Sequence, residues 1–109
     1  MAAILLIDIR ETISSELGQF LRSRQHSVSV SLTAGGAIKD LRANRASYDV
    51  IILNMSRNHA NDWKTLEEIH QFLHFNPTAP PILCLSTVYW GPRMQLAIER
   101  KGARFVYVQ

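Results

Sequence analysis

Residues Tyr48–Asn58 read YDVIILNMSRN, and this stretch indicates both a fold and a candidate site. Four apolar residues, Val50–Leu53, follow Asp49 and lead directly to the polar side chain of Asn54. A short apolar run of this kind is typical of a strand buried on both faces of a parallel sheet. Ligands bind beyond the carboxyl ends of such strands, so Asn54 is the first candidate site residue.

The segments on either side of this stretch alternate between strand and helix patterns. Short apolar or period-two runs predict strands, and apolar residues at helical spacing predict helices. Gly91 and Pro92 suit the start of the last helix, and Gly102 suits its end. The expected strands are residues 3–8, 26–32, 48–54, 82–86 and 104–108, and the expected helices are residues 11–24, 34–44, 61–75 and 91–101.

Two of the expected helices carry apolar stripes that should face the core. In the first helix the stripe comprises Ile13, Leu17, Phe20 and Leu21. The third helix can be capped by Asn61 or Asp62. Its stripe comprises Trp63, Leu66, Ile69 or His70, and Leu73.

Uninterrupted alternation of strand and helix implies right-handed crossovers and a parallel sheet covered on both faces. The chain of 109 residues is expected to form one such domain, residues 1–109. The candidate site lies where the strands end, because ligands of open α/β sheets bind beyond those ends. The residues at or just after those ends are Asp8, Asn54, Ser86 with Thr87, and Gln109.

Composition narrows the function classes. No apolar run is long enough to cross a membrane, and the apolar N-terminus lacks the basic region of a signal peptide. The single cysteine, Cys84, lies in an apolar run and is expected to be a buried core residue, which fits a cytoplasmic protein. The net charge of +3 comes from scattered basic residues, so direct nucleic-acid binding is not expected.

The chain resembles the receiver domains of bacterial two-component response regulators over nearly its whole length. ILLIDIRE (4–11) is similar to the family's first strand, which ends in paired acidic residues, and DVIILNMS (49–56) to its third, which ends in the phospho-accepting aspartate. PILCLST (81–87) and GARFVYVQ (102–109) are similar to the segments that carry a hydroxyl residue and a lysine. The resemblance implies a three-layer α/β fold of the CheY-like, flavodoxin-like type, with a five-stranded parallel sheet in the order 2-1-3-4-5.

The chain departs from this family at the positions that carry the chemistry. Ile9 stands where the family has a second carboxylate, Asn54 stands where it has the phospho-acceptor, and Gln109 stands where it has the lysine. The corresponding positions together hold Asp8, Ile9, Asn54, Ser86 or Thr87, and Gln109.

These departures predict a lost activity. Magnesium prefers carboxylate oxygens, and phosphoryl transfer depends on the charge that this ion and its ligands position. An amide such as Asn54 brings no charge and is a poor nucleophile, and Gln109 brings no positive charge to a phosphoryl group. We therefore expect no enzymatic activity, no phosphorylation, no cofactor, and weak or absent magnesium binding.

The leading hypothesis is a degenerate receiver that acts as a phosphorylation-independent interaction or dimerisation module. The alternatives are a receiver that uses another phospho-acceptor, and a small flavodoxin-like ligand-binding protein. Expected partners are a second copy of the chain, an output domain or another signalling protein. The candidate partner-binding residues are Trp90, Arg93, Arg100, Lys101, Arg104 and Tyr107.

Two further features carry expectations. The family's fifth helix has no counterpart before Gln109, so apolar sheet surface beside the first helix should be left for a partner. His70 and His74 lie at i, i+4, a spacing that can bind zinc, but no third ligand is apparent and a plain helix surface is expected.

Overall fold

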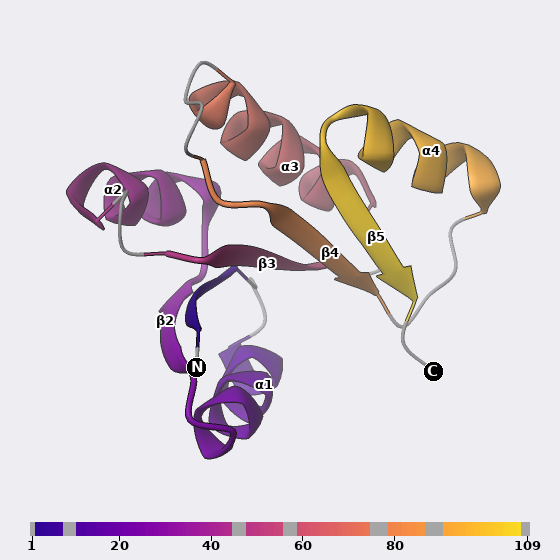
Figure 1. Ribbon diagram of the computed structural model, residues 1–109. Helices are drawn as coiled ribbons and strands as arrows, with labels where there is room; N and C mark the ends of the chain where they lie inside the picture. The colour runs from indigo at the N-terminus through magenta and orange to yellow at the C-terminus, as the bar shows by residue number, and fades with distance from the viewer. Residues whose placement is uncertain are drawn as a thin grey trace.

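The computed structural model describes residues 2–7, 11–44, 48–55, 59–74, 79–86 and 91–107. These residues form nine elements in strict alternation (Figure 1). No end of an element differs from the sequence-based prediction by more than two residues. The strands are β1 (Ala3–Ile7), β2 (Ser27–Ser31), β3 (Val50–Met55), β4 (Ile82–Ser86) and β5 (Ala103–Tyr107). The helices are α1 (Glu11–Ser23), α2 (Ala34–Asn44), α3 (His59–Leu73) and α4 (Pro92–Arg100).

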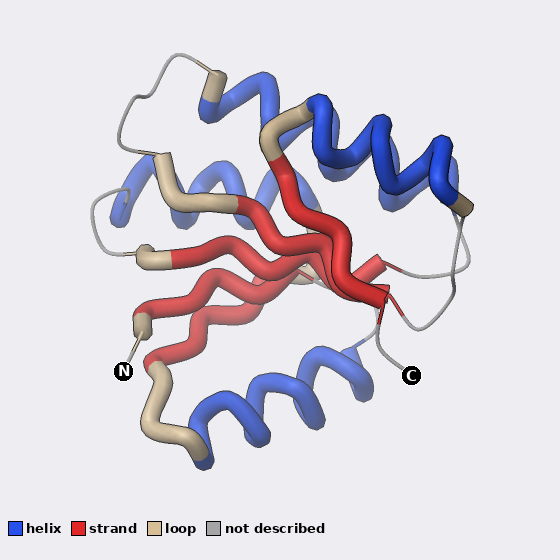
Figure 2. Tube along the Cα trace, turned by 45° about the vertical axis from the view of Figure 1, so that its right-hand side comes forward, coloured by secondary structure: helices blue, strands red, loops and turns tan. Residues whose placement is uncertain are grey.

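The five strands form one parallel sheet in the order β2-β1-β3-β4-β5, as expected. The central strand β3 pairs with β1 through Ile52 opposite Leu6, and with β4 through Leu53 opposite Cys84. Helices cover both faces, so the molecule has three layers (Figure 2). Because all strands run the same way, their carboxyl ends meet at one edge of the sheet.

The larger core lies between the sheet and helices α2, α3 and α4. Alternate residues of the strands point to this face, including Leu53 and Cys84, and they meet Leu66 and Ile69 of α3. Burial of Leu66, Ile69 and Leu73 confirms the predicted stripe of the third helix, with Trp63 packed at its margin. Cys84 is fully buried, as expected.

The smaller core lies on the other face, under α1. Leu17 and Leu21 of α1 pack against it, but the prediction that Phe20 points to the core is wrong, because its side chain is 55% exposed. Among the described helices α1 alone packs on this face, so a residue beside its central stripe has no neighbouring helix to meet. The guanidinium of Arg24 lies over the Phe20 ring instead, 5.4 Å from its centroid.

The end of α1 is closed by a six-residue hydrogen-bond pattern. The amide of His26 donates to the Leu21 carbonyl (3.2 Å), and the amide of Gln25 donates to the Arg22 carbonyl (2.9 Å). This is the Schellman arrangement, and it places Gln25 in the left-handed region at φ 68°. The Arg22 side chain then reaches β2 and donates to the Val28 carbonyl (3.0 Å).

Helix α2 begins where the sequence predicted, but its cap was not identified, and the cap predicted for α3 is wrong. The Thr33 hydroxyl accepts a hydrogen bond from the Gly36 amide (3.0 Å) and so caps α2. Helix α3 begins at His59, so Asn61 and Asp62 lie inside its first turn and the expected cap at either residue is wrong.

Candidate functional site

Asn54 lies near the carboxyl end of the central strand, where the sequence predicted a site. Its side chain is half-buried, and in the sheet it stands opposite Leu85. Ser86 ends β4 at the same edge, stands opposite Met55 and is buried. Because Ile52 belongs to the α1-side core and Cys84 to the other, strand alternation places Asn54 and Ser86 on opposite faces of the sheet. The two residues therefore share an edge but not a face.

Several predicted site residues lie outside the described part of the chain. Asp8, Ile9, Thr87 and Gln109 belong to this group. Asp8 and Ile9 directly follow β1, whose last residue stands opposite Leu53. Of the predicted site residues the structure describes only Asn54 and Ser86, which the fold brings to one edge.

Asp62 is a buried carboxylate near this edge that the sequence did not identify. It lies in the first turn of α3, directly after the β3–α3 connection, and is only 3% exposed. A carboxylate is favourable at that end of a helix, where the peptide dipoles present positive charge. Burial, together with the negative charge of Asp62, raises the pKa of the Cys84 thiol to about 12, so that thiol is neutral and unreactive at physiological pH.

The polar groups described at this edge have limited chemistry. An amide at Asn54 and a hydroxyl at Ser86 can donate and accept hydrogen bonds but carry no charge. Within the described residues, no group of three or more histidine, cysteine, aspartate or glutamate side chains could hold a metal ion. The described residues of this edge are therefore an amide and a hydroxyl, with the buried Asp62 carboxylate nearby at the start of α3.

Some of the predicted partner-binding residues around α4 and β5 have exposed side chains. Arg93, Arg100 and Arg104 are exposed. Lys101 is not simply exposed, because its ammonium lies over the Trp63 ring (5.2 Å to the centroid) and 3.9 Å from the Glu67 carboxylate. Trp90 and the Tyr107 side chain lie outside the part of the structure that is described.

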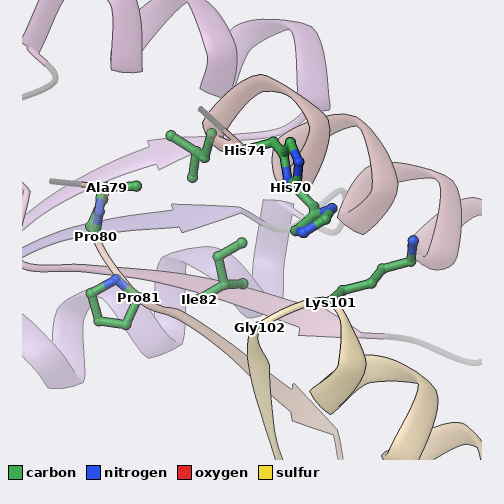
Figure 3. Close-up of a pocket in the computed structure, with 9 residues that line it drawn as sticks. His70, His74, Ala79, Pro80, Pro81, Ile82, Lys101 and Gly102 are labelled. Carbon is green, nitrogen blue, oxygen red and sulfur yellow. The ribbon is translucent and has the colours of Figure 1, made fainter. Parts of the chain in front are cut away.

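A pocket that the sequence did not indicate lies at the opposite edge of the sheet, near the amino ends of β4 and β5 (Figure 3). Its walls include His70 of α3 and His74 directly after this helix, and the His74 side chain is exposed. The two histidines meet edge to face, with ring centroids 5.5 Å apart. Three segments that are distant in the sequence line this pocket. Local sequence patterns do not predict such long-range contacts.

No described helix has the length and apolar character that crossing a membrane requires. No protein-family model matches the chain, and no curated protein matches its sequence. Comparison by structure, in contrast, gives many matches.

These structural matches include receiver domains from several bacteria. A response regulator receiver domain from Clostridium thermocellum superposes with a TM-score of 0.79 and 18% identity, covering 98% of this chain and 82% of the other. Vibrio cholerae chemotaxis protein CheY4 gives 0.77 and 20% identity, covering 98% and 86%. The CheX–CheY–BeF3–Mg complex of Borrelia burgdorferi gives 0.79 and 14%, covering 99% and 78%. The chain therefore has the fold of CheY-like response regulator receiver domains.

Proposed function

We propose that this chain is a receiver-like signalling domain that does not accept a phosphoryl group and acts as a phosphorylation-independent protein-interaction module. The observation that carries the proposal is Asn54, an amide near the carboxyl end of the central strand of a receiver fold. In the receiver domains that this chain resembles, the corresponding position holds the phospho-accepting aspartate.

Two physical arguments support the loss of phosphorylation. The amide nitrogen of Asn54 is delocalised into its carbonyl and is not a nucleophile, whereas a carboxylate is. Asp62, the described carboxylate at the start of α3, is too deeply buried to replace it as an acceptor. The alternative of another acceptor therefore gains no support from Asp62.

Protein partners follow from the fold and its exposed charge. The Borrelia burgdorferi CheY structure is a complex with CheX, a protein partner. In this chain the exposed Arg93, Arg100 and Arg104 on α4 and β5 offer positive charge to an acidic protein surface. We place the protein in the cytoplasm, as a partner of signalling proteins or of an output domain.

A second copy of the chain is a further proposed partner, through the sheet face under α1. Leu83, Leu85 and Val106 lie on this face and are only half-buried, and Val30 is 37% exposed. Apolar surface of this kind is covered when two molecules associate. Sedimentation across a wide concentration range should show a dimer that Leu85→Ser weakens. Leu96→Ser on α4, whose side chain is 49% exposed, is the matched control, and a monomer at every concentration would remove this part of the proposal.

Phosphoryl-site chemistry is tested with magnesium and beryllofluoride, which mimics a bound phosphoryl group. Tryptophan fluorescence of the natural chain should not change on adding Mg²⁺ and then beryllofluoride, and intact mass should not change with a small-molecule phosphodonor. The Ile9→Asp/Asn54→Asp double variant should bind Mg²⁺ more tightly, because each substitution adds a charged oxygen ligand. A saturable response or a stable phosphoryl adduct in the natural chain would refute the proposal.

A further inference from the structure

The pocket at the amino-terminal edge of the sheet has a volume of about 240 Å³. It opens between the end of α3, the start of β4 and the turn that joins α4 to β5 (Figure 3). This edge is opposite the one that carries Asn54, because all five strands are parallel. The lining residues are His70, Leu73, His74, Ala79, Pro80, Pro81, Ile82, Lys101 and Gly102.

One side of the pocket carries basic side chains. The Lys101 side chain lines the pocket and its ammonium lies toward Glu67 and Trp63, and His70 and His74 contribute imidazoles that can gain a proton. The carboxylate nearest to these groups in the described ion pairs is Glu67, which is 51% exposed and 3.9 Å from the ammonium. An exposed pair at that distance is weak, so the Lys101 ammonium stays available to an anion at the rim of the pocket.

The histidine in the middle of this group responds to the positive charge. The pKa of His70 is lowered below its ordinary value by partial burial, then by the positive charges of Lys101 and His74. The titratable groups that act on it are His74 directly after α3 and Lys101 after α4, and Glu67 lies beside Lys101. An anion placed among them would stabilise the imidazolium form, because opposite charges attract.

The other side of the pocket is apolar. Leu73 and Ile82 belong to the core, and Pro80 is buried at the approach to β4. Pro81 and Ala79 complete an uncharged wall (Figure 3). The pocket is smaller than the cavities of roughly 300–1,000 Å³ that hold drug-sized ligands. Its walls suit a compact molecule with an apolar body and one anionic group.

We propose that this pocket binds a small amphipathic carboxylate, with the anionic group beside Lys101, His70 and His74 and the apolar body against Leu73 and Ile82. The site is distinct from the edge that holds Asn54, and it does not depend on the function proposed above.

A divalent transition metal is the competing ligand for a histidine pair at i, i+4. The described residues offer no third protein ligand, and the Lys101 ammonium repels a cation. Both observations favour the anion.

The test uses the full chain and benzoate, whose ring and carboxylate match the two sides of the pocket. Benzoate should shift the backbone NMR signals of pocket residues saturably and raise the pKa of His70. Affinity should increase as pH falls from about 8 to about 5.5, because the bound anion favours protonated histidine. Lys101→Gln should weaken binding about five-fold, the effect expected for one partly exposed charge. Arg93→Gln, which removes one exposed charge at the other end of α4, should leave binding unchanged.

Because Lys101 also contacts Trp63, Lys101→Gln removes a packing contact as well as a charge. A second variant, His70→Gln, therefore tests the site even if Lys101→Gln misfolds. It should also weaken binding and abolish most of the pH dependence. Benzamide has the same shape without the charge, and inorganic phosphate has charge without the apolar body, so both should bind more weakly than benzoate. The proposal is overturned if benzoate gives no saturable shift, if benzamide or phosphate binds equally well, or if Arg93→Gln acts like Lys101→Gln. It is also overturned if Zn²⁺ shifts the two histidines while benzoate does not.

Because the pocket and Asn54 lie at opposite edges of the sheet, failure of benzoate to bind leaves the phosphoryl-site proposal untouched. Conversely, Asn54→Asp should leave benzoate affinity unchanged.

Discussion

Asn54 and Asp62 both lie near the carboxyl edge of the sheet, and each owes its surroundings to a local feature of the chain. Asn54 could be located because a polar residue that ends a buried apolar run marks the end of a strand. Asp62 could not be recognised as buried, because its direction depends on where α3 begins. A helix starting at Asn61 or Asp62 would leave the carboxylate at the cap, whereas the observed start at His59 turns it into the protein.

Gln25 carries a prediction at this scale. It adopts φ 68° at the end of α1, a conformation that costs a non-glycine residue roughly 1 kcal/mol. Gln25→Gly should therefore raise the free energy of unfolding by about 0.5 kcal/mol, after allowance for the greater freedom of glycine in the unfolded chain. Urea denaturation measures this. Gln25→Ala is the control and should give no such gain, and an unchanged midpoint for Gln25→Gly would contradict the account.

Elements were the most predictable level of the structure. All nine follow from apolar periodicity and from turn residues such as Gly102, whose φ of 78° ends α4 as expected. The face that each helix buries was less predictable. Phe20 belongs to the apolar pattern of α1, yet helical spacing does not reveal that no other described helix packs beside α1 on its sheet face.

The cap of α2 gives a prediction at the scale of an element. Thr33→Ala removes the hydroxyl that accepts the Gly36 amide, which should lower the free energy of unfolding by about 1 kcal/mol. Thr33→Ser keeps the acceptor and should retain most of the stability. Thermal unfolding followed by circular dichroism distinguishes the two, and equal losses in both variants would show that the hydroxyl does not act as a cap.

At the scale of the whole molecule, the sheet order rests on long-range contacts that local patterns do not determine. The order 2-1-3-4-5 came from the family resemblance, and the structure confirms it. The pocket was not predicted, because α3, the start of β4 and the α4–β5 turn meet only once the chain is folded.

The pH dependence of global stability is a prediction for the whole molecule. The folded pKa of His70 lies below the ordinary value of 6.5, so the unfolded chain binds a proton more readily just below that pH. Above about pH 6.5 His70 therefore makes its full contribution to the free energy of unfolding. This contribution is lost as pH falls through the folded pKa. Urea midpoints between about pH 8 and 5 should fall less steeply in His70→Gln than in the natural chain. Lys64→Gln, at an exposed position of the same helix, should keep the natural slope, and an unchanged slope in His70→Gln would exclude this role.

The hydrogen bond from Arg22 to the Val28 carbonyl bears on whether this protein aggregates at high concentration. Strand β2 is one of the two edge strands of the sheet, and its sequence SVSVS contains no charged residue that would repel another molecule. Such an edge is a template on which foreign strands add and aggregates grow. Because Arg22 at the end of α1 occupies a carbonyl of that strand with a charged side chain, we expect it to oppose the addition of a foreign strand there.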